Sequence, residues 1–66
     1  MVTDEIDGHL GAMEKNEDMS LRDQRIHLNI LERNSLYFSD DQWKRYLALS
    51  ERFRKEIVAI YPGLGS

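Results

Sequence analysis

The residues in this sequence best suited to chemistry are Asp23 and His27, which lie four positions apart. On a helix, this spacing places an acid and an imidazole on the same side, as in hydrolytic sites and around metal ligands. A metal site needs three or four converging ligands, and the only other histidine, His9, lies among acids in a distant segment. We therefore expect no metal ion here, and we interpret His27 as a partly buried or interfacial polar residue.

Patterns for other kinds of catalysis, or for cofactors, are missing from the sequence. The chain has no cysteine, which excludes disulfide bonds, thiolate zinc sites and thiol catalysis. There is no glycine-rich phosphate loop and no Gly-x-Ser-x-Gly elbow, and the run Gly63-Leu-Gly-Ser follows a predicted helix instead of opening one. A domain of two or three helices also has little room to enclose a pocket. The sequence predicts a protein that is not an enzyme and holds no cofactor or metal.

Arg54 is the charged residue that fits its predicted position least well. At about 100° per residue of helix, it falls inside an otherwise apolar sector. A charge there must reach solvent, face a partner protein, or pair with an acid such as Glu32 or Asp23. Arginine, tyrosine and tryptophan are also enriched at binding hot spots. We predict a protein interface, alternatively part of the intramolecular core, made of Trp43, Tyr46, Phe53, Arg54, Ile57 and Tyr61.

A basic helix edge suggests nucleic-acid binding as the alternative. Its candidate residues are Lys44, Arg45, Arg52 and Lys55, with further arginines on the preceding predicted helix. Glu51 and Glu56 interrupt this edge, and the formal net charge of the chain is −3. The charge is unevenly distributed, because residues 1–19 contain six acids and one lysine whereas residues 20–66 are slightly basic.

The element that would position both candidate surfaces is a helix over residues 40–60. Ser39 and Gln42 have the spacing of a capping box, and Phe38 and Trp43 that of a hydrophobic staple. Pro62 disfavours helical geometry at the residue before it, so residues 62–66 are predicted to form a loose tail.

A second helix is predicted over residues 21–35, with Ser20 as its N-cap. Its apolar residues fall on two opposite sides: Leu21, Leu28 and Leu31 on one, and Ile26, Ile30 and Tyr37 on the other. A helix that is apolar on two sides needs two neighbours. One is expected to be the helix over 40–60, packed back as an antiparallel hairpin across a short connection. The other is the N-terminal segment or a second protomer.

The N-terminal segment is predicted as a short helix or a partly ordered arm over residues 3–15. Ile6, Leu10 and Met13 have the spacing of one helix face, but Gly8 and Gly11 each cost about 1 kcal/mol relative to alanine. No strand pattern is present.

Together these elements predict one small all-α domain spanning residues 1–66. It has an acidic N-terminal helix or arm (1–19), an antiparallel helical hairpin (20–61) and the loose tail. A chain of this size buries only about 60% of its unfolded surface, so a partner or self-association would supplement its core. No apolar run approaches the roughly 18 residues of a membrane span, and the first residues are acidic where a signal peptide is basic. We expect a cytoplasmic protein without a membrane partner.

Three families of small helical proteins share features with the chain. The chain is loosely similar to the haemolysin-expression-modulating family, whose members bind nucleoid-structuring proteins. The similar residues are Leu31-Glu-Arg-Asn, Ser39-Asp-Asp-Gln-Trp, Tyr46, Glu51-Arg and Lys55-Glu-Ile. That family's Tyr-Ser-Ala-Ala-Asp-His run is replaced here by Tyr46-Leu-Ala-Leu-Ser-Glu-Arg. The hairpin also resembles sporulation aspartyl-phosphate phosphatases, but their Ser-Gln-Glu-Leu-Asp motif is replaced by Ser50-Glu-Arg-Phe-Arg54, so the likeness does not extend to that activity. Small type III secretion chaperones are helical hairpins as well.

The function expected from the sequence is protein binding without catalysis. The protein would act as a regulator, inhibitor, chaperone or assembly subunit, through the apolar and aromatic face of the helix over 40–60. Its partner would be another protein or a second copy, giving a homodimer. The alternative is a transcriptional or nucleoid regulator that contacts nucleic acid through the basic edge.

Overall fold

The structure, a computed structural model, describes residues 2–61 and residue 63. Within this part the chain forms three α-helices and no strand: α1 (Val2–Lys15), α2 (Leu21–Arg33) and α3 (Asp40–Ile60), with a short 3-10 turn, η1 (Ser35–Tyr37), before α3. The predicted all-α class is therefore confirmed. The predicted tail over residues 62–66 lies outside the described residues, apart from Gly63.

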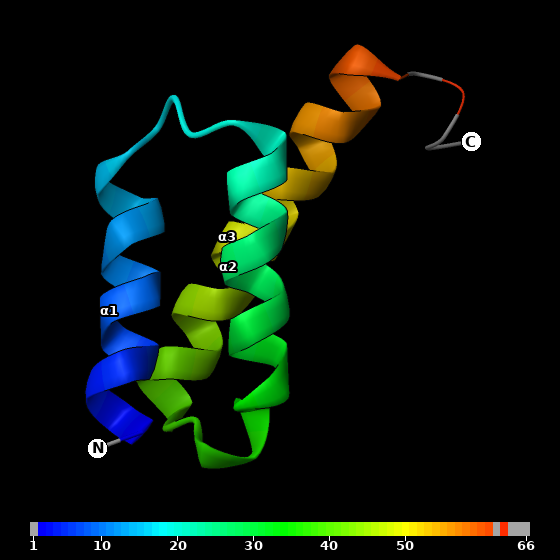
Figure 1. Cartoon of the computed structure of the whole chain (residues 1–66). Helices are drawn as coiled ribbons and strands as arrows, with labels where there is room; N and C mark the ends of the chain where they lie inside the picture. Colours follow the sequence, from blue (N-terminus) through cyan, green and yellow to red (C-terminus); the bar gives the residue numbers. More distant parts are fainter. Residues whose placement is uncertain (1, 62, 64–66) are drawn as a thin grey trace.

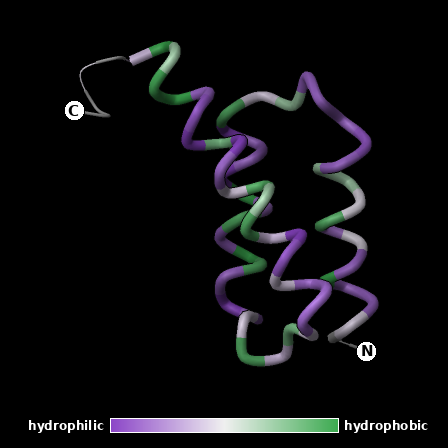
Figure 2. The backbone as a smooth tube through the Cα atoms, turned by 180° about the vertical axis from the view of Figure 1, so that it is seen from behind, coloured by the Kyte–Doolittle hydropathy of each residue, from purple (hydrophilic) through white to green (hydrophobic). Residues whose placement is uncertain are grey.

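The three helices pack against one another in every pair. Figure 1 shows α1 and α2 side by side, the chain turning at η1, and α3 lying against both. A helix of 21 residues is about 32 Å long, whereas helices of 13 or 14 residues reach only about 20 Å. The last turns of α3 consequently project beyond the other two helices, as both Figure 1 and Figure 2 show.

The start of α3 has the geometry that its sequence predicts. The Gln42 backbone N–H donates to Ser39 Oγ at 3.2 Å, and the Ser39 N–H donates to Gln42 Oε1 at 2.9 Å. The ring of Phe38 meets that of Trp43 edge-on at 4.9 Å between centroids. Both the capping box and the staple are confirmed, and α3 spans the predicted residues 40–60.

Helix α2 begins as predicted but ends two residues earlier than expected. Ser20 Oγ accepts the Asp23 backbone N–H at 3.2 Å. At the other end, the Asn34 side-chain amide donates to the Ile30 carbonyl at 2.9 Å, and the Asn34 backbone N–H turns back to Leu31. These bonds satisfy terminal carbonyls of the helix, so the chain tightens into η1 instead of continuing as α helix.

Helix α1 is a full helix, not an arm, and it supplies half of the buried apolar residues described. Its Ile6, Leu10 and Met13 are at most 1% exposed. They pack in one cluster with Leu28 and Leu31 of α2 and Leu49 of α3. Burial of three side chains outweighs the cost of the two glycines, because each buried aliphatic side chain contributes about 1.5–3 kcal/mol.

Helix α2 packs against two helices, α3 and the N-terminal α1, as its apolar residues predict. Leu28 and Leu31 face the core shared with α1 and α3, whereas Ile26 on the opposite side is 48% exposed and Tyr37 is exposed as well. A three-helix arrangement places both neighbours on the same side of α2, so the other side stays in solvent.

Gly8→Ala and Gly11→Ala are each expected to stabilise the fold by up to about 1 kcal/mol, since alanine has the higher helix propensity. Nothing lies within 4 Å of a Cβ added at either position, and none of the described residues has a positive φ. For a domain of this size, such a gain raises the melting temperature by about 4–8 °C. Thermal unfolding monitored by circular dichroism checks this. An unchanged or lower melting temperature in both variants would contradict the helical geometry of α1.

No described helix has the combination of length and apolar character that crossing a membrane requires.

Candidate protein-binding surface

Two of the four residues predicted to contact nucleic acid are hydrogen-bonded to residues of α1. Arg45 donates from Nε to Glu14 at 3.0 Å and from Nη1 to Asp7 at 3.3 Å. Arg52 donates from Nη1 to the Met13 carbonyl at 3.1 Å. The other two residues, Lys44 and Lys55, are exposed. The four side chains therefore do not form one continuous free edge, and the two arginines tie the acidic α1 to α3.

The hydrogen bonds from Arg45 hold the pKa of the Glu14 carboxyl below its ordinary value. A carboxyl with a lowered pKa in the folded state stabilises the fold above its unfolded pKa, and this contribution is lost as the pH falls through the folded-state pKa. Because both side chains are about one-third exposed, solvent screening limits the contribution to below about 1 kcal/mol.

Glu14→Gln is accordingly expected to reduce stability slightly at pH 7 and to have little effect near pH 3. Urea unfolding of both proteins at the two pH values checks this. An equal difference between variant and wild type at both pH values would show that the charge of Glu14 is not involved.

Gln24 joins the N-terminal half of α2 to the C-terminal half of α3. It is fully buried, and its Nε2 donates to the Met19 carbonyl at 2.8 Å and to Glu56 Oε2 at 2.6 Å. The sequence pattern places Glu56 among the charged residues of the basic helix edge, which is expected to face solvent. Instead Glu56 is half-buried and turned toward α2.

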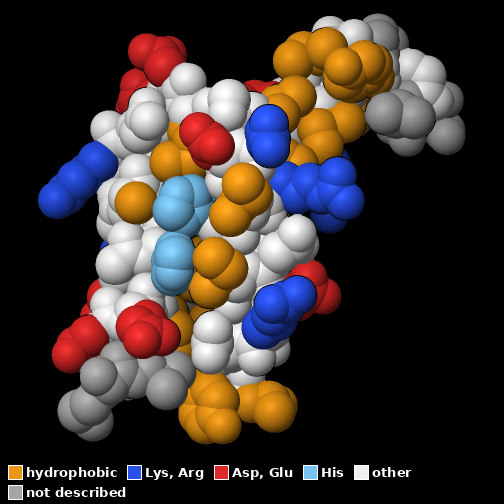
Figure 3. Space-filling view, viewed as in Figure 1, with side chains coloured by type: hydrophobic (Ala, Val, Ile, Leu, Met, Phe, Trp, Pro, Cys, Tyr) orange, Lys and Arg blue, Asp and Glu red, His pale blue; other side chains and the backbone are white. Residues whose placement is uncertain are grey.

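His27 meets His9 of α1, not Asp23. Their Nδ1 atoms lie 2.8 Å apart, so one ring donates and the other, which must be neutral, accepts. Figure 3 shows the two imidazoles next to each other on the surface. Among the described residues no group of three or more His, Asp or Glu side chains is placed to hold a metal ion.

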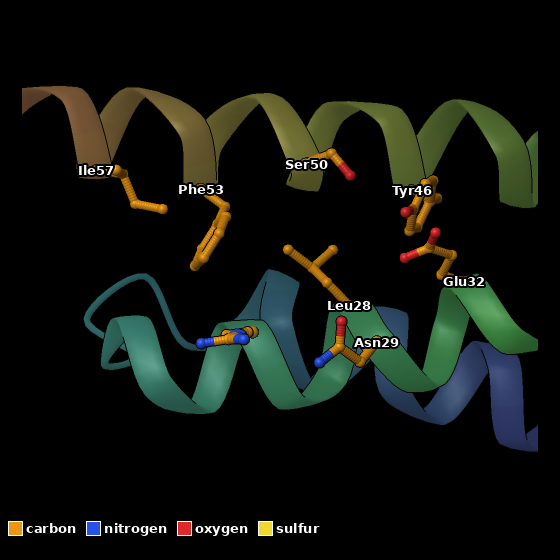
Figure 4. Close-up of a pocket in the computed structure, with 8 residues that line it drawn as sticks. Leu28, Asn29, Glu32, Tyr46, Ser50, Phe53 and Ile57 are labelled. Atoms are coloured by element: carbon orange, nitrogen blue, oxygen red, sulfur yellow. The ribbon is translucent and has the colours of Figure 1, made fainter. Parts of the chain in front are cut away.

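A groove lies between α2 and α3, and we call it the α2–α3 groove. It has a volume of about 400 Å³ and an apolar floor, with polar side chains along its rim (Figure 4). Leu28, Tyr46, Phe53 and Ile57 form the floor, and Arg25, Asn29, Glu32 and Ser50 lie around them. A second hollow of about 320 Å³ continues it toward the end of α3, where Leu21, Arg22 and Tyr61 join the lining.

The groove and the second hollow bring together four of the six predicted interface residues: Tyr46, Phe53, Ile57 and Tyr61. Trp43 is 39% exposed and stacks edge-on against Phe38 and Tyr46 beside the groove. Arg54 is exposed and makes no hydrogen bond or ion pair with any described residue, Glu32 and Asp23 included.

Leu47 also belongs to this surface, and the predicted interface set does not include it. It lies one helical turn after Trp43 and is 58% exposed. The signal was present in the sequence, because Leu47 occupies the same apolar sector as Trp43 and Arg54. Val58 and Ile60 are also exposed on the projecting end of α3.

The lining of this surface combines an apolar floor with a rim that carries both signs of charge, an arrangement suited to binding. Comparisons of the chain with protein-family models, with curated proteins and with solved structures found no match.

Proposed function

We propose that this protein is a non-enzymatic protein-interaction module. Its α2–α3 pair acts as an antiparallel helical hairpin and receives an apolar helix of a partner along the α2–α3 groove. One observation carries the proposal: the apolar floor of the groove is continued by uncovered apolar side chains of α3, with Leu47 beside the groove and Ile60 and Tyr61 at the end of the helix each more than half exposed.

The energetics favour a partner on this surface. Burying a fully exposed aliphatic or aromatic side chain contributes about 1.5–3 kcal/mol, so several half-exposed ones can together offset the cost of association. The described core of the chain has only six buried apolar residues. A partner that covers the groove would therefore stabilise the fold as well as occupy the site.

The form of the groove indicates the kind of partner. A hollow that runs between two helices suits a third helix with apolar residues along one face. Arg22 and Arg25 on the rim make no ion pair with described residues and would favour an acid on that helix. Nucleic-acid binding would need Lys44, Arg45, Arg52 and Lys55 to be free together, and the bonds of Arg45 and Arg52 to α1 favour the protein-binding proposal over it.

Photo-crosslinking in the native cell tests this proposal. A photoreactive residue in place of Leu47 is expected to give light-dependent protein adducts, whereas the same residue in place of Ala12, exposed on α1, is not. The adducts should disappear when Ile57→Glu places a charge in the groove of a protein that circular dichroism shows to be folded. Adducts that are equal at positions 47 and 12, or that persist with Ile57→Glu, would contradict the proposal.

A further inference from the structure

The outer side of α3 carries a coiled-coil type of spacing. Six positions alternate in steps of four and three residues, which is the a/d pattern of a helix seam. We call them the α3 seam: Trp43, Leu47, Ser50, Arg54, Ile57 and Tyr61. Leu49, which faces the core, does not belong to this seam.

The α3 seam is not covered by the described part of the chain. Trp43, Leu47, Arg54 and Tyr61 are exposed, and the half-buried Ser50 and Ile57 line the α2–α3 groove beside them. The seam is about 27 Å long at 1.5 Å per residue. It therefore runs along most of α3, including the turns that project beyond the other helices (Figure 1).

We infer that the partner helix is α3 of a second copy, antiparallel to the first and related to it by a two-fold axis that crosses the seam at the level of residue 52. This inference rests on the proposed function and specifies its partner. The α3 seam has the same spacing read from either end. The antiparallel register therefore places Trp43 opposite Tyr61 of the second copy, Leu47 opposite Ile57, and Ser50 opposite Arg54. Each layer then joins an a position to a d position, as antiparallel helix pairs require.

The charges select the antiparallel direction. In a parallel pair Arg54 would face Arg54 of the second copy, and like charges in a seam are destabilising. In the antiparallel pair Arg54 faces Ser50, and Glu51 of the second copy lies beside it on the flank of the seam. Glu51 and Arg54 make no ion pair with described residues, so both are available for this contact. The two-fold axis repeats this polar layer once, and polar layers of this kind fix the register of a helix pair.

The rim of the α2–α3 groove is complementary to itself under the same two-fold axis. Glu32 lies near Tyr46 at one end of the groove (Figure 4), and Arg22 and Arg25 lie toward Tyr61 at the other. Antiparallel packing brings the Glu32 end of one copy to the arginine end of the other. The two hairpins then form a four-helix bundle that encloses the groove floors, with α1 of each copy on the outside.

Disulfide trapping tests the register of the helix pair. Because the described residues include no native cysteine, a disulfide reports on the introduced cysteines alone. Leu47→Cys and Ile57→Cys are purified separately and oxidised in a glutathione buffer, alone and as an equimolar mixture. The inference predicts at least about tenfold more disulfide-linked dimer in the mixture, because only the 47–57 pairing brings the Cα atoms to within about 7 Å. In the matched control, Leu47→Cys is mixed with Ala48→Cys, whose thiol does not lie on the α3 seam.

Two outcomes overturn the inference. Efficient dimer formation by Leu47→Cys alone would indicate a parallel pair in register. No dimer in any mixture, with the molar mass staying that of one chain, would exclude the second copy as the occupant. In that case photo-crosslinked adducts at position 47 with a different protein would still support the proposed function, whereas the absence of any adduct would reject both.

Discussion

Leu10→Ala is expected to lower the free energy of unfolding by about 3 kcal/mol, within the usual range of 2–5 kcal/mol for a buried leucine. Leu10 is completely buried in the centre of α1 and packs in the cluster that joins all three helices. A single core in a domain of this size supplies only about 3–5 kcal/mol in total, so the variant is expected to be largely unfolded at room temperature.

The measurement is urea unfolding followed by far-ultraviolet circular dichroism at one fixed protein concentration. Leu36→Ala is the matched control, because it is the same substitution at a leucine that is 92% exposed. A loss below about 1 kcal/mol for Leu10→Ala, or equal losses in both variants, would show that α1 is not part of the cooperative core.

Gln24→Glu is expected to destabilise the fold by about 3–5 kcal/mol at pH 7, the usual cost of an uncompensated buried charge. Gln24 is fully buried, and its amide nitrogen lies 2.6 Å from Glu56 Oε2. The substitution replaces a donor by a second carboxylate. The loss is largest where both acids are ionised and decreases as acid protonates one of them, so the gap between variant and wild type should narrow from pH 7 to pH 4.

The double variant Gln24→Glu with Glu56→Gln is the control for this prediction. It restores one donor and one acceptor across the α2–α3 contact and should recover most of the lost stability. The Met19 carbonyl, which also accepts from Gln24, loses its donor in the double variant, so recovery should not be complete. An equally unstable double variant would mean that the Gln24–Glu56 bond contributes little and that the single substitution acts through shape alone.

The parts of the fold that sequence predicts best are those set by neighbouring residues. Ser39, Gln42, Phe38 and Trp43 lie within one helical turn of each other, and they define the start of α3 correctly. Whether α1 is a helix or a partly ordered arm depends instead on its burial against two helices that are distant in sequence. Local propensity counts the cost of Gly8 and Gly11 without that tertiary gain.

The spacing of residues within one helix could not predict the polar contacts between helices. His9 meets His27, Arg45 meets Glu14, and Gln24 meets Glu56 at separations of 18 to 32 residues. Which of several acids or amides an arginine or glutamate meets is decided by how the helices lie against each other. A helix wheel drawn for one helix carries no such information, and it placed Glu56 on the solvent side for this reason.

The candidate surface could be predicted in part from the sequence. The apolar sector of α3 is visible in the sequence, and it leads to Tyr46, Phe53, Ile57 and Tyr61, which the structure places along the groove and the hollow that continues it. The distinction between core and surface within that sector needed the positions of α1 and α2. Only these show that Leu49 faces inward while Leu47 faces out.

Sedimentation equilibrium over a concentration series from micromolar to millimolar tests the central claim most directly. The proposed dimer predicts a molar mass that rises from 7.8 kDa toward twice that value for the wild type and for Ala48→Glu. Leu47→Glu, which carries the same new side chain one residue away on the α3 seam, should weaken the association about 100-fold or more, because the charge disrupts two layers of the dimer. A wild-type mass of 7.8 kDa at every concentration, or equal weakening by both variants, would contradict self-association through the α3 seam.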